Sequence, residues 1–217
     1  MINKFLKAKH WQLFVLLVGL PLVFQVVVMI ITFLDAFAGN APDLMSLGSM
    51  LVVIPVLMLV GMATFYGWFW SVGVGLQKFI PDEAKMNVKL FKVFLAFPFV
   101  YIIGIFSCVA LVFTDLIDSM DLMFFMDMEN PNVSLIITAV SIVLLLHLFA
   151  MFCNFYCLYF VARTVKTAEL QKTVKFEEYI AEFFLLWFFA VGVWFIQPKV
   201  NEFVEDDDKS ETNPSSD

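Results

Sequence analysis

Residues 134–162 read SLIITAVSIVLLLHLFAMFCNFYCLYFVA and contain no Asp, Glu, Lys or Arg. As a helix, this run is long enough to cross a bilayer, because a hydrocarbon core of roughly 30 Å needs about 20 apolar residues. Basic residues follow it directly, at Arg163, Lys166, Lys172 and Lys175. The pattern predicts a transmembrane helix with a basic exit.

The composition of the whole chain agrees with a membrane protein. Hydrophobic residues make up 62% of the sequence and charged residues 15%, whereas a soluble domain is about half apolar and a quarter charged. No dense basic patch occurs, which argues against nucleic-acid binding. The three cysteines, Cys108, Cys153 and Cys157, lie in apolar windows, so a disulfide framework is not expected.

Charge-free windows of this kind predict an all-α membrane protein, a compact bundle of five transmembrane helices within residues 1–200. The expected helices cover residues 12–34, 50–76, 93–114, 134–162 and 177–197. The fifth is short, since residues 180–196 would span only about 25 Å. Pro21 is expected to kink the first helix. The acidic residues 201–217 lack an apolar pattern and are expected to be a disordered tail.

The distribution of Lys and Arg predicts the orientation in the membrane. Three lysines lie in the N-terminal segment, four in the 78–92 loop and four basic residues at 163–175, whereas 35–49 and 115–133 have none. Basic residues concentrate on the cytoplasmic side, so a cytoplasmic N-terminus is expected. The side of the tail depends on whether residues 180–196 cross the membrane fully. Crossing is favoured over a re-entrant or interfacial segment.

Similar surroundings of two prolines suggest an internal repeat. The sequence GLPLVF around Pro21 and the sequence AFPFVY around Pro98 lie in helices expected to run in the same direction. This predicts two helical hairpins related by an axis along the membrane normal, followed by one further helix.

Polar side chains inside the expected spans form the main candidate site. His147 and Asn154 are seven residues apart and share one helical face, and Gln25 in the first helix is a candidate partner. Polar groups at membrane depth usually face the bundle interior or a water-filled cavity. Hydrogen bonds that fix helix packing are favoured here over a substrate or proton path.

A stripe of small residues recurs every fourth position of the second expected helix, at Ala63, Gly67, Ser71 and Gly75. Small residues let another helix approach closely. Packing within the chain is favoured over a dimerisation face.

Two further clusters of residues can be explained without a catalytic or metal-binding role. The methionines between Met120 and Met128 could bind Cu(I), but they fit the apolar face of a short interfacial helix better. Glu177, Glu178 and Glu182 begin a helix, where anions complement the helix dipole. No metal or cofactor is therefore expected, and no phosphate-binding, hydrolase or metalloprotease motif is found.

The segments Lys7–Gln12, Trp187–Phe189 and Ile196–Lys199 resemble parts of small, uncharacterised bacterial multi-pass inner-membrane proteins. The resemblance implies a bacterial cytoplasmic membrane and carries no known activity.

Taken together, the sequence favours a non-enzymatic structural or accessory subunit of unknown biochemical role. Its expected partners are the lipid bilayer and either another membrane protein or further copies of the chain. The alternative is a small transporter or channel component that uses the site at Gln25, His147 and Asn154.

Overall fold

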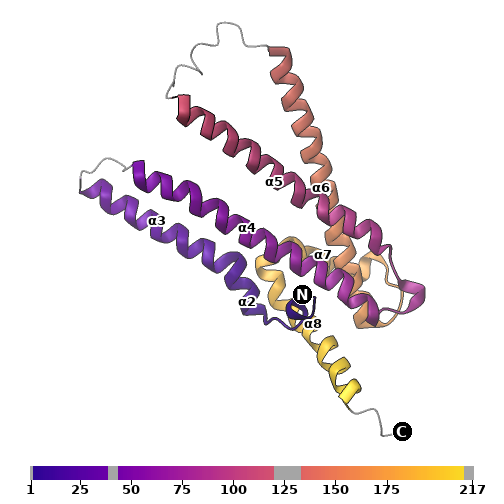
Figure 1. Cartoon of the computed structure of the whole chain (residues 1–217). Coiled ribbons are helices and arrows are strands. Elements are labelled where there is room, and N and C mark those ends of the chain that lie inside the picture. Colours follow the sequence, from indigo (N-terminus) through magenta and orange to yellow (C-terminus); the bar gives the residue numbers. More distant parts are fainter. Residues whose placement is uncertain (1, 39–43, 120–132, 213–217) are drawn as a thin grey trace, which may run out of the picture. The chain divides into compact units, whose positions relative to one another are not determined.

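The computed structural model describes residues 2–38, 44–119 and 133–212, and within these ranges the chain is helical, without a strand (Figure 1). It divides into two compact units. The first comprises Met1–Val88 and Leu158–Asp217, and the second Lys89–Cys157. The predicted all-α class is confirmed, and four segments are long and apolar enough to cross a membrane: His10–Phe37, Val53–Phe79, Val88–Cys108 and Ile137–Leu170.

The first unit begins with two short helices, α1 (Ile2–Leu6) and α2 (His10–Phe14). The chain then passes through a π-helical turn, η1 (Val15–Gly19), into α3 (Leu20–Phe37). In a regular helix, a proline at position 21 would lack its N–H bond and clash with the carbonyl four residues earlier. The wider π turn relieves this conflict. The irregularity expected at Pro21 therefore lies in the turn just before it.

The next helix, α4 (Leu44–Gly75), returns beside α3 and ends in two 3₁₀ turns, η2 (Leu76–Phe79) and η3 (Asp82–Ala84) (Figure 1). Its hydroxyl groups bond to the helix itself. Thr64 Oγ1 donates to the Val60 carbonyl at 2.8 Å and Ser71 Oγ to the Gly67 carbonyl at 2.7 Å. Such bonds satisfy polar groups inside an apolar helix.

The second unit is built from α5 (Val88–Ser119) and α6 (Val133–Leu170), whose last residues, from Leu158, belong to the first unit. Both helices extend beyond the predicted 93–114 and 134–162. Phe94 packs edge-on against Tyr156, with ring centroids 4.9 Å apart. Pro98 lies within the continuous helix α5, whereas Pro21 follows a π turn, so the predicted hairpin repeat stays a prediction.

The predicted fifth helix is corrected. In place of one helix over 177–197, the chain forms α7 (Phe176–Trp187) and α8 (Phe189–Thr212), separated at Phe188. With 12 residues, α7 is about 18 Å long, too short for a core of roughly 30 Å. An added Cβ at Gly192 would lie 1.7 Å from the Leu185 carbonyl oxygen. The sharp junction therefore requires a glycine at position 192.

The predicted disordered tail is corrected for residues 201–212, which continue α8. Two of its carboxylates are held by lysines from distant parts of the chain. Asp208 pairs with Lys7 at 2.6 Å, and Asp207 pairs with Lys78. These contacts give the acidic segment a reason to stay helical that its own sequence lacks. Residues 213–217 lie outside the described residues.

The core of the first unit joins α4, α6 and α8. Fully buried aromatic side chains, Trp68 and Phe69 from α4 and Phe160 from α6, are accompanied by Ile196 from α8. A smaller cluster of Ile80, Ala84 and Ala168 lies below the end of α4 and packs against Phe79 and Phe203. These contacts hold the C-terminal helix against the ends of two candidate spans.

Candidate functional site

The polar site predicted from the sequence is divided between the two units. Gln25 is an exposed residue of α3 in the first unit, whereas His147 and Asn154 lie on α6 in the second. His147 Nδ1 lies 3.5 Å from Tyr101 Oη of α5. Asn154 is half-buried. The structure thus gives His147 a partner that the sequence did not indicate, and it describes Gln25 only within its own unit.

The other predicted clusters are placed as follows. The Met120–Met128 cluster lies outside the described residues. Within the described ranges, no group of three or more His, Cys, Asp or Glu residues could hold a metal ion. Glu178 caps α7, because its carboxylate accepts from the Lys175 backbone N–H at 2.7 Å. The ion pair with Lys172 and this backbone bond lower the pKa of Glu178.

The small-residue stripe on α4 faces α1. An added Cβ at Gly67 would lie 2.9 Å from the Phe5 ring, and one at Gly75 would lie 2.7 Å from Leu6 Cδ1. Ser71, between the two glycines, is buried, whereas Ala63 is exposed. The two glycines therefore let the N-terminal helix approach the backbone of α4 closely.

Gln197 of α8 joins three elements at this place. It is fully buried. Its Oε1 accepts from Trp68 Nε1 of α4 at 2.5 Å. Its Nε2 donates to carbonyl oxygens that follow or end α1: Phe5 at 3.1 Å, Leu6 at 3.2 Å and Ala8 at 2.8 Å. One amide thereby binds carbonyls at and just beyond the C-terminus of a short helix, where intrahelical donors run out.

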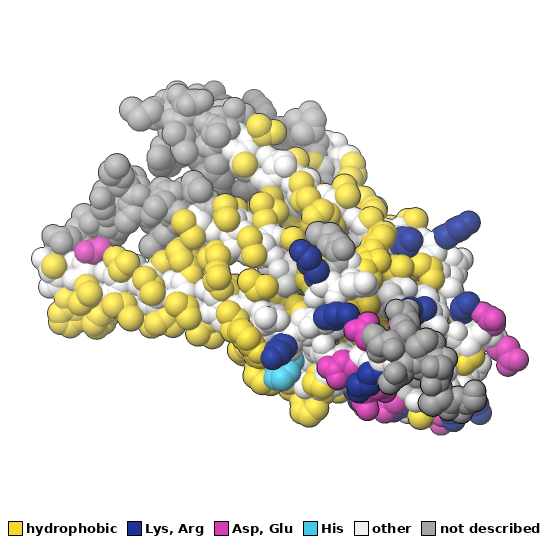
Figure 2. Space-filling model, turned by 60° about the horizontal axis from the view of Figure 1, so that its bottom comes forward, with side chains coloured by type: hydrophobic (Ala, Val, Ile, Leu, Met, Phe, Trp, Pro, Cys, Tyr) yellow, Lys and Arg dark blue, Asp and Glu magenta, His cyan; other side chains and the backbone are white. Residues whose placement is uncertain are grey.

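Asn201, one turn beyond Gln197, repeats this contact. Its Nδ2 donates to the carbonyls of Leu6 and Ala8 at 3.1 and 3.2 Å. We call Gln197, Asn201, Trp68 and the carbonyls of Phe5, Leu6 and Ala8 the amide junction. Charged side chains gather at one end of the face shown in Figure 2, and hydrophobic side chains cover most of the rest.

A second polar cluster links α6, α7 and α8. Glu182 of α7 is 4% exposed. Its Oε1 contacts Lys199 Nζ at 3.2 Å and Lys166 Nζ at 3.4 Å, and Glu169 contacts the same two lysines at 2.9 and 3.1 Å. Burial disfavours the charge of Lys199, but its hydrogen bonds to Glu169 and Glu182 outweigh burial and raise its pKa. The four side chains form a closed network of two cations and two anions.

Ring contacts locate the junction between α7 and α8 relative to Phe79. Phe189, the first residue of α8, contacts Trp68 with ring centroids 5.0 Å apart and Phe65 at 5.1 Å. Phe65 precedes Phe79, the end of its candidate span, by 14 residues, or about 21 Å. The junction therefore lies beside α4, about 21 Å from Phe79.

Both ends of the α7–α8 pair return to the level of Phe79. Phe203 of α8 lies 6.2 Å from the Phe79 ring. Gln171, which precedes α7, donates from Nε2 to the Phe79 carbonyl at 2.9 Å. The pair thus enters and leaves at one end of the first unit, as a helical hairpin with its tip at Phe188.

The amide junction was not predicted from the sequence. Gln197 stands at the end of an apolar run, followed by Pro198 and Lys199. A single glutamine there indicates a helix end as readily as a buried junction. Its partner Trp68 lies 129 residues earlier, and its carbonyl partners lie 189–192 residues earlier. Only its position between an apolar run and a helix-disfavouring proline could have drawn attention to it.

No protein-family model, curated protein or solved structure matches this chain.

Proposed function

We propose that this chain is a non-enzymatic structural or accessory protein of a bacterial inner membrane. The observation that supports this most is the use of its buried amide. Both hydrogen-bonding ends of Gln197 are engaged by the chain itself. Glu182 likewise contacts lysines of two neighbouring helices. Polar groups used in this way hold elements together, which is the packing role of polar residues in membrane proteins.

The proposed topology has four crossing helices, a cytoplasmic N-terminus and a hairpin, α7–α8, that begins and ends on the cytoplasmic side without crossing the membrane. The excess of Lys and Arg in alternate loops supports the orientation. The contacts of Phe189 with Phe65 and of Phe203 with Phe79 support a hairpin whose two ends lie on the same side. The C-terminus would then be cytoplasmic too, in contrast to the outside tail that a crossing fifth helix requires.

Reporter fusions test this topology. An enzyme active only outside the cytoplasm should be inactive when fused after residue 217 and active when inserted within residues 120–132. A fusion to the chain truncated after Lys199 should also be inactive. Activity of the fusion after residue 217 would mean that α7–α8 crosses the membrane, and it would overturn the proposed hairpin.

The accessory role requires a partner in the membrane. No residue of α3 is buried, and exposed apolar side chains such as Leu22, Val23 and Phe33 surround it. At bilayer depth this surface meets lipid, another membrane protein or a second copy of the chain. Purification in mild detergent should recover a stoichiometric partner or a homo-oligomer. Recovery of the chain alone as a monomer would count against the accessory role.

A second function, a small transporter or channel component, is favoured by one specific contact. His147 Nδ1 of α6 lies 3.5 Å from Tyr101 Oη of α5, and polar side chains at membrane depth can line the path of a solute or a proton. Reconstituted protein would then carry a solute or protons across liposomes. His147→Ala should abolish that flux, whereas Leu146→Ala should not. Absence of flux for a range of ions and protons would exclude this alternative.

A further inference from the structure

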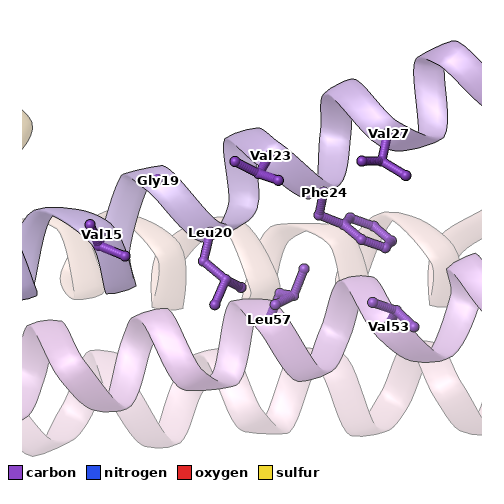
Figure 3. A pocket seen from close by; sticks show the side chains of 8 residues that line it. All are labelled: Val15, Gly19, Leu20, Val23, Phe24, Val27, Val53 and Leu57. Atoms are coloured by element: carbon purple, nitrogen blue, oxygen red, sulfur yellow. The ribbon is translucent and has the colours of Figure 1, made fainter.

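An apolar groove runs between the first helix pair of the first unit. Its lining comes from η1, α3 and α4: Val15, Gly19, Leu20, Val23, Phe24, Val27, Val53 and Leu57. The cavity volume is about 570 Å³. In Figure 3, Leu20 and Leu57 point toward one another across the space between the helices. The lining offers only hydrocarbon side chains and one glycine to an occupant.

The small residue Gly19 contributes to the open space of the groove. The three atoms nearest to an added Cβ at Gly19 all belong to the Val15 side chain of its own turn, at 3.8–3.9 Å, so no side chain of α4 comes closer there. Nearby, Leu17 reaches Gly61 of α4, where an added Cβ would lie 4.0 Å from Leu17 Cδ2. The helices therefore touch at Leu17 and leave the neighbouring face uncovered.

The dimensions of the groove match one acyl chain of one leaflet. Val15 and Val27 are 12 residues apart, which is about 18 Å along a helix. One leaflet contributes about 15 Å to the hydrocarbon core. Val15 lies five residues inside the candidate span His10–Phe37, so the groove begins just below the expected headgroup level.

Positive charge lies above this entrance. Lys9 is exposed and precedes Val15 by six residues, or about 9 Å. Lys4 is exposed as well. Among the described residues, neither lysine forms an ion pair, whereas Lys7 between them is held by Asp208. His10 packs against Trp194 in a tilted arrangement, with ring centroids 4.6 Å apart, which places aromatic side chains at the same level.

We propose that this groove binds one acyl chain of an anionic phospholipid whose headgroup contacts Lys4 and Lys9. Two features select this occupant over a helix from a partner. The groove is one leaflet long, and Lys9 lies at its headgroup end, with Lys4 on the preceding helix, where neither lysine pairs with a described residue. The inference rests on the membrane embedding proposed above. Reporter fusions test that embedding without reference to lipid, so the two can fail separately.

Native mass spectrometry of the full-length protein tests the proposal, with dioleoyl phosphatidylglycerol and dioleoyl phosphatidylcholine as probes. The wild type should retain more phosphatidylglycerol. Gly19→Leu, which fills the groove, should lose retention of both lipids, whereas Leu22→Phe, outside the lining, should not. The double variant Lys4→Gln/Lys9→Gln should lose the preference for phosphatidylglycerol, by about fivefold per lysine, and keep its retention of phosphatidylcholine. Lys85→Gln, whose lysine pairs with Asp82, is the matched control.

Three results would overturn the proposal. The first is equal retention of the two lipids by the wild type. The second is unchanged retention by both Gly19→Leu and a second groove variant, Val23→Trp, which also guards against misfolding of either one. The third is a protein dimer that disappears in Gly19→Leu, because a second copy would then be the occupant.

Discussion

A buried glutamine side chain has two donor hydrogens and one acceptor oxygen, and groups left unpaired inside a protein cost about 1–3 kcal/mol. Gln197→Leu keeps a similar volume but removes every hydrogen bond of the amide junction that this side chain makes. We expect the free energy of unfolding to fall by about 1–3 kcal/mol or more. Gln25→Leu, at an exposed position of α3, is the control. Thermal unfolding in detergent measures both variants, and equal melting temperatures would show that the junction is not structural.

Lys199 gives a prediction about pH. Its pKa is raised in the folded chain, since the hydrogen bonds to Glu169 and Glu182 outweigh burial. A raised pKa means that this stabilisation is complete below the unfolded pKa of about 10.4 and is lost as pH rises through the folded value. Lys199→Gln should therefore melt below the wild type at neutral pH, and the gap should shrink at strongly alkaline pH. A difference in melting temperature that stays constant from neutral to strongly alkaline pH would contradict the raised pKa of Lys199.

At the scale of elements, the α7–α8 hairpin depends on Gly192. Alanine there would place its Cβ 1.7 Å from the Leu185 carbonyl oxygen, a backbone atom that cannot rotate away. We expect Gly192→Ala to separate the two helices and to lower the melting temperature strongly. Gly104→Ala is the matched control, because nothing lies within 4 Å of its added Cβ. In a helix interior that change should stabilise by about 0.5–1 kcal/mol.

The docking of α1 on α4 can be disturbed without touching α1. The double variant Gly67→Leu/Gly75→Leu adds side chains where Phe5 and Leu6 now pack. An added Cβ would lie 2.9 Å from the Phe5 ring at position 67 and 2.7 Å from Leu6 Cδ1 at position 75. The displaced N-terminal segment should become a better substrate for trypsin at Lys4 and Lys7. Gly61→Leu, where the nearest atom is 4.0 Å from an added Cβ, should leave cleavage unchanged. Equal cleavage of the wild type, the double variant and Gly61→Leu would mean that the docking of α1 does not depend on the small-residue stripe.

The elements differ in how far the sequence could predict them. Charge-free length alone predicts spans such as residues 134–162, because a bilayer imposes that length directly. The break at Phe188 carries no proline or glycine at its own position. It depends on the contact of Gly192 with Leu185 and on the packing of Phe189 against α4. The helical end of α8 likewise depends on Lys7 and Lys78. Contacts between residues so far apart leave no local pattern.

The candidate sites show the same difference: single residues and periodic patterns could be recognised in the sequence, whereas their contact partners could not. A histidine in an apolar run is visible in the sequence, so His147 could be named, but its partner Tyr101 lies 46 residues away on another helix. The stripe at Gly67 and Gly75 was visible through its period of four. The helix that covers it was not, because the five residues of α1 are too few to show a periodicity.

For the whole molecule, the ion pair of Lys7 and Asp208 predicts that the two ends of the chain meet on one side of the membrane. In a variant whose native cysteines are replaced by alanine, Lys7→Cys/Asp208→Cys should form a disulfide on mild oxidation in intact membranes. Asp35→Cys/Asp208→Cys should not, because Asp35 follows His10 by 25 residues, about 37 Å along the span. The crosslink requires an α8 that returns to the side of α1, since a crossing segment would separate position 208 from position 7 by the full bilayer. Labelling of Asp208→Cys by a membrane-impermeant thiol reagent applied outside the cell would refute this arrangement.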